Sequence, residues 1–203
     1  MKNHVQGMIR VAAALALLVL AGCAHPVTLR TDIKYPQNDK LPQTVGYYIS
    51  DAHRALEVTT KGGGGDMIKY SPYHDLEPAL IETLSSVFSK VYSVPEQGRQ
   101  AYIASHDITF VFEPIIQTQS DSHSAFFWPP SDFEITLHVT AVDAQGKSIW
   151  SGDFTGHGHV EKNRSLTDVP PANLAAQEAF GKLRKALLEA PAFKAAQETQ
   201  AAQ

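Results

Sequence analysis

The sequence predicts an α+β domain, in which a mainly antiparallel sheet carries two amphipathic helices packed on one face. Residues 132–142 alternate apolar and polar side chains, and a tight turn separates them from a second strand-like run over 147–156. Apolar residues recur at helical spacing in 75–91 and again in 172–189. A hairpin with one polar face and two one-sided helices indicates separate layers of sheet and helix.

Three strands are expected before the first helix. Residues 44–49 are rich in β-branched and aromatic side chains, and residues 55–60 alternate in character. The run 67–70 follows four glycines, 62–65, which could connect a hairpin or cradle a phosphate group. The Lys-Ser or Lys-Thr pair of a phosphate-binding loop does not follow them, so we interpret the glycines as a hairpin connection.

The first helix is expected over 75–91, with Asp75 as its N-cap. Residues 95–106 are polar and are predicted to be irregular. A largely buried strand is expected over 108–116, and Pro114 within it indicates a bulge or a sheet edge. Strands and helices therefore alternate in blocks, which favours the α+β class.

The N-terminus has the features of a secretory signal. Lys2 and Arg10 precede an apolar run over 11–20, which is shorter than the roughly 20 residues that span a bilayer. The string Leu20-Ala21-Gly22-Cys23 follows, and it contains the single Cys of the chain. These residues resemble the lipobox of bacterial lipoproteins; the alternative is an ordinary signal peptide with an incidental Cys.

The lipobox resemblance implies cleavage after Gly22 and lipidation of Cys23, with diacylglycerol on the thiol and an acyl chain such as palmitate on the amine. Two or more acyl chains make a stable membrane anchor. Ala24 is not the acidic residue that tends to hold enteric-type lipoproteins at the inner membrane. The resemblance therefore implies an outer-membrane protein with its body in the periplasm.

The predicted domain organisation follows from this N-terminus. Residues 1–22 form the signal peptide, 23–42 a lipid-anchored tether, 43–190 the periplasmic α+β domain and 191–203 a flexible tail. Cleavage removes Lys2 and Arg10, so the mature protein has 15 basic and 21 acidic side chains. The resulting net charge of about −6 argues against nucleic acid or anionic lipid headgroups as main partners. Because lipid occupies Cys23, no disulfide is expected.

The order of these features resembles a known family. It comprises the lipobox, an extended lead, a V-G-x-x-I strand at 45–49, an L-x-x-x-L helix, a Phe/Val-rich strand, a D-x-x-G hairpin at 143–146 and a C-terminal amphipathic helix. This order is similar to the YajG-type lipoproteins of Gram-negative bacteria. It is more distantly similar to periplasmic domains related to the N-terminal domain of TolB and to ring-forming polysaccharide-secretion lipoproteins.

The histidines at positions 157 and 159 are a candidate metal site. His157 and His159 share one strand face with Glu161 and could share a metal ion, but the sequence identifies no further ligand, so a solvated strand end is the alternative. No G-x-S-x-G elbow or H-E-x-x-H helix is present. We therefore expect no metal, no cofactor and no enzymatic activity.

Three consecutive aromatic residues, Phe126, Phe127 and Trp128, precede Pro129-Pro130 in a segment between two strands. Aromatic side chains on a stiff loop are typical of contact surfaces, whether with a protein or at a membrane interface. The alternative is that the loop folds back and covers the core. We interpret the three aromatics as a contact with a partner.

The sequence therefore predicts an outer-membrane-anchored periplasmic lipoprotein that acts without catalysis, as an accessory or assembly factor of the cell envelope. Its partner would be an envelope protein or further copies of itself. The alternative is a lipid- or lipopolysaccharide-binding auxiliary lipoprotein of an envelope transport system. A large apolar cavity between sheet and helices would favour the alternative, whereas a filled core would favour the first function.

Cys23→Ala should abolish lipidation, because the thiol that receives the diacylglycerol is lost. The variant should remain as an unlipidated precursor or become soluble, and it should incorporate no radiolabelled palmitate. Palmitate labelling that persisted in this variant would contradict the prediction.

Overall fold

The computed structural model describes residues 24–37, 40–122, 130–161 and 169–194. Its elements, in chain order, are β1 (Ala24–Pro26), β2 (Leu41–Tyr47), α2 (Asp51–Arg54), β3 (Val58–Lys61), β4 (Met67–Tyr70), α3 (Pro72–Ser85), β5 (Phe88–Ser93), α4 (Arg99–Ser105), β6 (Phe110–Asp121), β7 (Asp132–Asp143), β8 (Ser148–His159) and α5 (Pro170–Glu189). The fold is α+β, as the sequence predicts.

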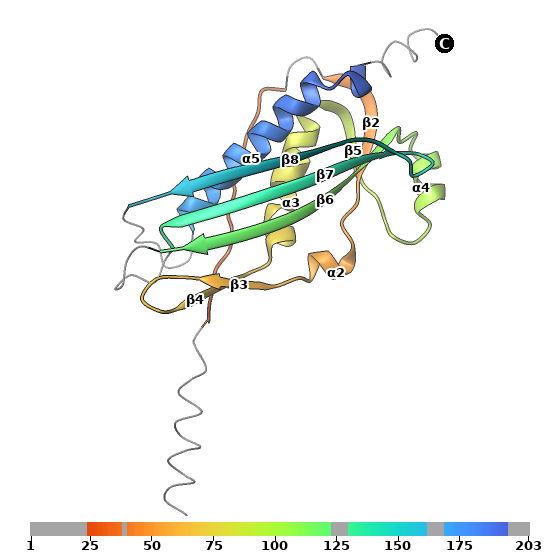
Figure 1. Ribbon diagram of the computed structural model, residues 1–203. Helices are drawn as coiled ribbons and strands as arrows, with labels where there is room; N and C mark the ends of the chain where they lie inside the picture. The colour runs from red at the N-terminus through yellow and green to blue at the C-terminus, as the bar shows by residue number, and fades with distance from the viewer. Residues whose placement is uncertain (1–23, 38–39, 123–129, 162–168, 195–203) are drawn as a thin grey trace, which may run out of the picture.

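Two sheets make up the strand layer. The larger has the order β5-β2-β6-β7-β8, and the smaller has the order β1-β4-β3. The long helices α3 and α5 lie on the same face of the larger sheet (Figure 1). Strands β6, β7 and β8 are antiparallel, whereas β2 runs parallel to both β5 and β6.

The predicted hairpin is confirmed as β7 and β8, in which Asp132 pairs with His159 and Ala141 with Trp150. In the connecting turn, the Asp143 carboxylate accepts the backbone N–H groups of Gln145 and Lys147, both at 2.9 Å. Pro114 lies on β6 just beyond Phe112, where the pairing with β2 ends. Because the pairing with β2 has already ended there, the lack of an N–H group on Pro114 costs no hydrogen bond to β2.

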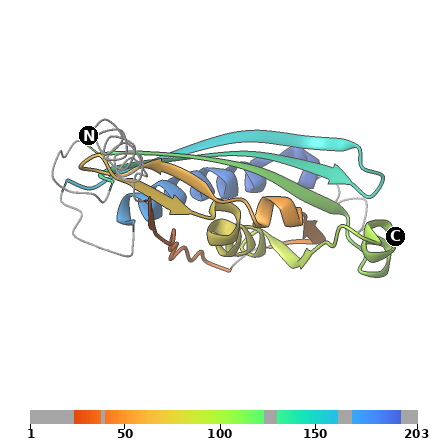
Figure 2. The ribbon, with the colours of Figure 1, turned by 90° about the horizontal axis from the view of Figure 1, so that it is seen from below.

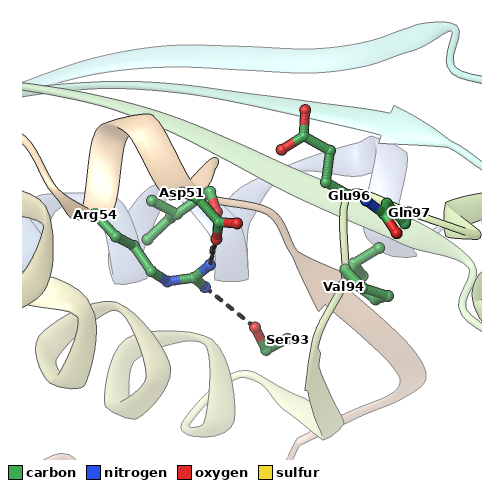
Figure 3. Close-up of a pocket in the computed structure, with 8 residues that line it drawn as sticks. Asp51, Arg54, Ser93, Val94, Glu96 and Gln97 are labelled. Atoms are coloured by element: carbon green, nitrogen blue, oxygen red, sulfur yellow. Dashed lines mark hydrogen bonds and ion pairs between the residues drawn. The ribbon is translucent and has the colours of Figure 1, made fainter.

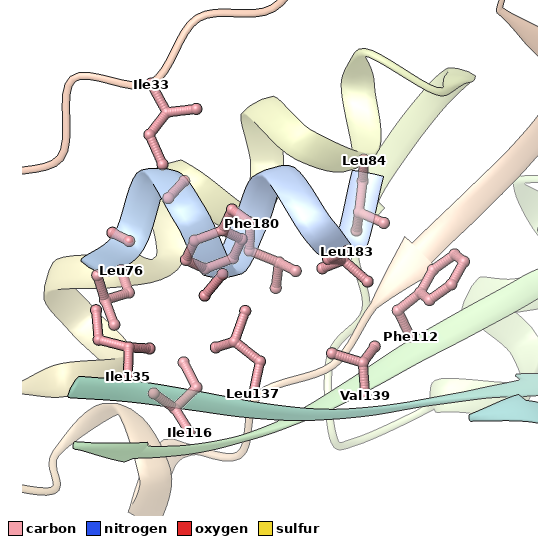
Figure 4. Packing of buried hydrophobic residues seen from close by; sticks show 14 of the residues in the cluster. Ile33, Leu76, Leu84, Phe112, Ile116, Ile135, Leu137, Val139, Phe180 and Leu183 are labelled. Carbon is pink, nitrogen blue, oxygen red and sulfur yellow. The ribbon is translucent and has the colours of Figure 1, made fainter. Parts of the chain in front are cut away.

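The core lies between the larger sheet and the two long helices (Figure 4). Alternate residues of β7, including Ile135, Leu137 and Val139, point toward Leu76 of α3 and Phe180 of α5. Each of these five side chains is almost completely buried. Burial of one such side chain contributes about 1.5–3 kcal/mol, so this interior is the main source of stability.

Helix α5 lies unusually close to β8 because glycines face it. A Cβ atom added at Gly156 would lie 2.0 Å from the carbonyl oxygen of Ala175, and one at Gly158 would lie 1.8 Å from that of Pro171. The same helix closes part of the β8 edge, since Glu178 accepts the His157 N–H at 2.8 Å and Lys182 donates to the Thr155 carbonyl at 2.7 Å. A covered edge strand resists pairing with another chain.

The first helix is shorter than the expected range 75–91. Helix α3 ends at Ser85, and Phe88 already belongs to β5. The apolar residues at 87, 88 and 91 fit a helical stripe, but they also fit the buried side of a short strand, and pairing with β2 decides between the two. Asp75 is not the N-cap, a position that Ser71 holds.

The region 95–106, expected to be irregular, contains the helix α4. Its Ile103 is buried in a second, smaller core with Val94, Val111 and Val142. A single buried side chain in a seven-residue helix leaves no periodic pattern to recognise. Through Ile103, this helix packs on Val111 of β6 and Val142 of β7 near one end of the larger sheet.

The segment expected to be a tether is instead packed against the domain. β1 pairs with β4, and Val27, Leu29 and Ile33 are buried in the main core, with Leu29 only 1% exposed. We call residues 24–35 the N-terminal strap. Three apolar side chains at irregular spacing show no secondary-structure period, yet their burial holds the strap on the helices.

The start of the expected tail, 191–203, also belongs to the folded body. Phe193 is fully buried, and its ring lies 5.4 Å from that of Phe110 and 5.7 Å from that of Trp150, between ring centroids. The Gln43 side chain donates to the Phe193 carbonyl oxygen at 2.8 Å. Because the Phe193 side chain is part of the core, the domain extends at least to residue 194.

Leu84→Asp should destabilise the protein by several kcal/mol, because the charged side chain would lie unpaired in the core. That loss is comparable with the whole stability of a typical domain, about 5–15 kcal/mol. Ile81→Asp, on the same helix at a side chain that is 38% exposed, is the matched control and should cost about 1 kcal/mol or less. Chemical unfolding of both variants measures the difference; equal losses would contradict this packing.

Gly156→Ala should destabilise the domain by about 1–3 kcal/mol, because the new methyl group would push α5 away from β8. Gly181→Ala is the matched control on α5, where the nearest atom to an added Cβ is the Tyr35 hydroxyl at 3.9 Å. There the helix interior should gain about 0.5–1 kcal/mol. Thermal melts should therefore shift in opposite directions, and a rise for Gly156→Ala would refute the close contact.

Candidate functional site

Several of the features singled out in the sequence meet at one end of the larger sheet. We call this the anchor end, and it comprises residues 24–26, 61–67, 119–121, 132–134 and 157–159. Ala24 pairs with Met67, and Asp132 lies between Asp121 and His159 in register. The Ser120 hydroxyl joins the two sheets by a hydrogen bond to the Lys61 carbonyl at 2.5 Å. The strand ends lie together in Figure 2.

The predicted lipidation site Cys23 and the aromatic residues Phe126, Phe127 and Trp128 lie outside the described residues. Their neighbours in the chain are described. Ala24 is the first residue of β1, and β6 ends at Asp121 opposite Asp132, where β7 begins. The chain therefore leaves and re-enters the sheet at the anchor end on either side of the aromatic segment.

The four glycines form the β3–β4 turn, which confirms the predicted hairpin connection. The Gly62 N–H donates to the Asp66 carbonyl at 2.9 Å, and β3 and β4 pair in antiparallel register on either side. Gly64 and Gly65 have φ angles of 66° and 87°, which side chains rarely adopt. These positive φ angles explain why positions 64 and 65 are glycines.

The histidines of β7 and β8 form cross-strand pairs with carboxylates on the sheet face turned away from α3 and α5. The distances from imidazole Nδ1 to carboxylate oxygen are 3.2 Å for His157–Glu134, 2.7 Å for His159–Asp132 and 2.7 Å for His138–Asp153. Strand pairing places His138, which the sequence does not group with the other two, on the same face. Sequence spacing cannot reveal such a cross-strand arrangement.

The His157–Glu134 and His159–Asp132 pairs border a hollow of about 270 Å³ at the anchor end, whose lining also includes Gln119. Within the described ranges, no group of three or more His, Cys, Asp or Glu side chains is placed to hold a metal ion. Glu161 lies beyond the end of β8 and is exposed. Metal independence stays a prediction.

A larger crevice, of about 530 Å³, opens where β2 and β5 end (Figure 3). Parallel strands bring the loops that follow them to one sheet edge, which is a common place for ligands. Its lining combines three apolar residues with polar and charged ones: Ile49, Asp51, Arg54, Ser93, Val94, Pro95, Glu96 and Gln97. The sequence contains no motif that marks these residues as a group.

Arg54 is fixed in this crevice by several partners. Its guanidinium donates to both carboxylate oxygens of Glu77, at 2.9 and 3.3 Å, and to the Ile49 carbonyl at 2.7 Å. A further hydrogen bond reaches the Ser93 hydroxyl at 3.2 Å. Since its donors are engaged within the protein, Arg54 holds the loops after β2 and β5 together.

Glu77 also accepts a hydrogen bond from the Tyr47 hydroxyl at 2.8 Å. Burial by itself would raise the pKa of Glu77, but the hydrogen bonds from Arg54 and Tyr47 and the guanidinium charge outweigh it and lower that pKa. Burial raises the pKa of Tyr47. The crevice lining includes neither His nor Cys, so it provides no nucleophile paired with an imidazole base.

The space between sheet and helices is filled by side chains. Phe88, Phe112 and Phe180 are among the largest side chains that are completely buried there. The two hollows described above, and a third of about 310 Å³ beside Arg99 and Glu113, lie outside that core. Of the helices that the structure describes, none has the length and apolar character needed to cross a membrane.

No protein-family model matches the chain, and no curated protein matches it significantly. Among solved structures, it is similar to the PelC dodecamer from Paraburkholderia phytofirmans, with 13% identity over 77% of this chain and 94% of that chain and a TM-score of 0.47. It is also similar to protein XCC0632 from Xanthomonas campestris, of DUF330, with 10% identity over 88% and 99% of the two chains and a TM-score of 0.43. These TM-scores carry no conclusion about function or assembly.

Glu77→Gln should destabilise the protein by about 1–3 kcal/mol at neutral pH, the usual range for hydrogen bonds to a charged group. Because the folded-state pKa of Glu77 is lowered, this stabilisation is present above the unfolded pKa, about 4.3, and is lost as the pH falls through the folded-state pKa. Denaturant unfolding at pH 7 and pH 3 should show the difference between wild type and variant shrinking in acid.

The control is Glu57→Gln, which removes an exposed ion pair with Lys69 and should change the free energy of unfolding little at either pH. A difference for Glu77→Gln that grew in acid would contradict the lowered pKa.

Proposed function

We propose that this protein is a lipid-anchored periplasmic protein of the outer membrane that serves the cell envelope through protein contacts and catalyses no reaction. The anchor rests on the signal sequence and Cys23, and the outer-membrane location rests on Ala24. The observation that carries the proposed mode of action is the filled core, because it leaves the surface as the place where the molecule meets other molecules.

The filled core also weighs against the alternative, a carrier of lipid or lipopolysaccharide. Such a carrier needs a mostly apolar cavity of about 300–1,000 Å³. In this protein, Leu76, Phe112 and Phe180 occupy the space between the sheet and the helices. The hollows at the surface are lined by charged side chains such as Asp51, Glu96 and Glu134.

A non-catalytic role is supported by the state of the polar groups. The partly buried charged pair Arg54 and Glu77 uses its hydrogen-bonding groups to join α2, α3 and β5. Catalytic groups need a partner and a substrate within hydrogen-bond reach, in an accessible cleft. These two side chains have their partners inside the fold, and their arrangement fits a structural role.

Replacing Phe127 and Trp128 together by Ala should weaken the recovery of partner or self-association while barely changing the melting temperature. Loss of one hot-spot aromatic costs about 2 kcal/mol or more of binding, which is roughly a 30-fold loss in affinity. Crosslinking in envelope preparations followed by native mass spectrometry measures the recovery.

The matched control replaces Leu56 and Ile115 by Ala, since these are large apolar side chains on other exposed surfaces. This control should leave the recovery unchanged. A strongly lowered melting temperature with intact association in the Phe127/Trp128 variant would show that the aromatics cover the core, and the proposed contact would then be wrong.

A further inference from the structure

We propose that the anchor end of the molecule rests directly on the lipid surface, so that β6, β7 and β8 extend away from the membrane. The inference depends on the proposed lipidation of Cys23. It goes further by assigning a membrane-contacting surface and an orientation to the folded domain. The occupant of this surface is the bilayer that holds the anchor.

Folded structure begins directly after the predicted lipid-bearing residue. Cys23 is joined to Ala24, whose Cα is about 3.8 Å away across one peptide unit, and Ala24 is already the first residue of β1. β1 is held by its parallel pairing with β4, and the Val27 N–H donates to the Lys69 carbonyl at 2.9 Å. The acyl chains on Cys23 would therefore begin next to the folded domain.

The N-terminal strap is bound to α3 and cannot easily lengthen into a tether. The Leu29 N–H donates to the Asp75 carboxylate at 3.0 Å, and the Tyr35 N–H donates to the Glu82 carboxylate at 3.1 Å. Releasing the strap from α3 would break both bonds and expose Leu29. The fold therefore favours the strap held against the domain, with the lipid close to the anchor end.

The surface beside Ala24 can approach a lipid headgroup layer closely. The β3–β4 turn next to it is formed by glycines, and Gly64 and Gly65 are exposed. His25 lies 3.3 Å from Asp66 at the end of the same turn, between the imidazole Nε2 and a carboxylate oxygen. A turn without large side chains allows the backbone to come near the membrane plane.

The same geometry places the opposite end of the sheet in the periplasm. Strand β7 runs from Asp132 at the anchor end to Asp143, which at about 3.3 Å per residue is roughly 36 Å. The crevice residue Ile49 directly follows Tyr48, whose N–H donates to the Phe112 carbonyl at 2.9 Å, and Phe112 lies roughly 30 Å from Asp121 along β6 by the same measure. Both α4 and the crevice are then accessible to a partner that approaches from the periplasm.

The test compares fluorescent probes at the two ends of the full-length, lipidated protein. Lys61→Cys places a thiol at the anchor end, and Gln145→Cys places one in the β7–β8 turn; both residues are exposed. The labelled proteins are inserted into phosphatidylcholine vesicles that contain headgroup spin-labelled phosphatidylcholine. Quenching should be several-fold stronger at position 61 than at position 145. Equal quenching at both positions, or stronger quenching at 145, would overturn the proposed orientation.

A second variant tests the missing tether itself. A linker of Ala followed by twelve Gly and Ser residues, inserted between Cys23 and Ala24, would reach roughly 20 Å and keeps Ala directly after Cys23. Quenching at position 61 should then fall toward the level at position 145. Unchanged quenching would show that the short connection does not hold this end at the membrane.

Intact mass separates this inference from the proposed function. A purified protein whose mass shows no lipid on Cys23 would overturn the anchor, and the orientation with it. A lipidated protein with equal quenching at both probes would leave the anchor standing and overturn the orientation alone.

Discussion

The close packing of α5 on β8 is the contact on which the rest of the domain depends. Gly156 and Gly158 allow the helix backbone to approach the strand, and small residues on the helix, such as Ala175 and Ala179, meet them. Because this approach is close, Glu178 of α5 can reach the exposed strand edge. One steric condition therefore sets the thickness of the core, fixes the helix on the sheet and protects an edge that could otherwise pair with another chain.

Both ends of the described chain complete the core that this packing creates. Leu29 enters it from the N-terminal strap, and Phe193 enters it from the short helical segment 191–194 after α5. The strap is tied to α3 through Asp75 and Glu82, whose carboxylates accept backbone N–H groups. As a result, the residue that would carry the lipid is followed at once by folded structure. A lipid on Cys23 would therefore be joined directly to the fold, which is the basis of the proposed orientation.

Many polar side chains in the fold form hydrogen bonds or ion pairs with each other. The Arg54–Glu77–Tyr47 network joins the loops at the crevice, and the imidazole–carboxylate pairs cover the open sheet face along β7 and β8. The Arg54–Glu77 pair is partly buried, and both of its members have hydrogen-bonding partners, as groups in such positions usually do. Among the described residues, side chains such as Leu76, Phe112 and Phe180 occupy the space between the sheet and the helices.

Local patterns in the sequence determined the α+β class, the β7–β8 hairpin, the glycine turn and the second long helix, because alternation, helical spacing and turn residues act over a few neighbouring positions. The residues that resemble a signal sequence and a lipobox form an equally local pattern. The tertiary structure alone decided that 88–93 pairs as a strand with β2, that the residues after Cys23 pack as a strap, and that Phe193 is buried. It also decided which histidines and carboxylates lie side by side. Each of these depends on contacts between residues far apart in the chain, whose free energy no local pattern records.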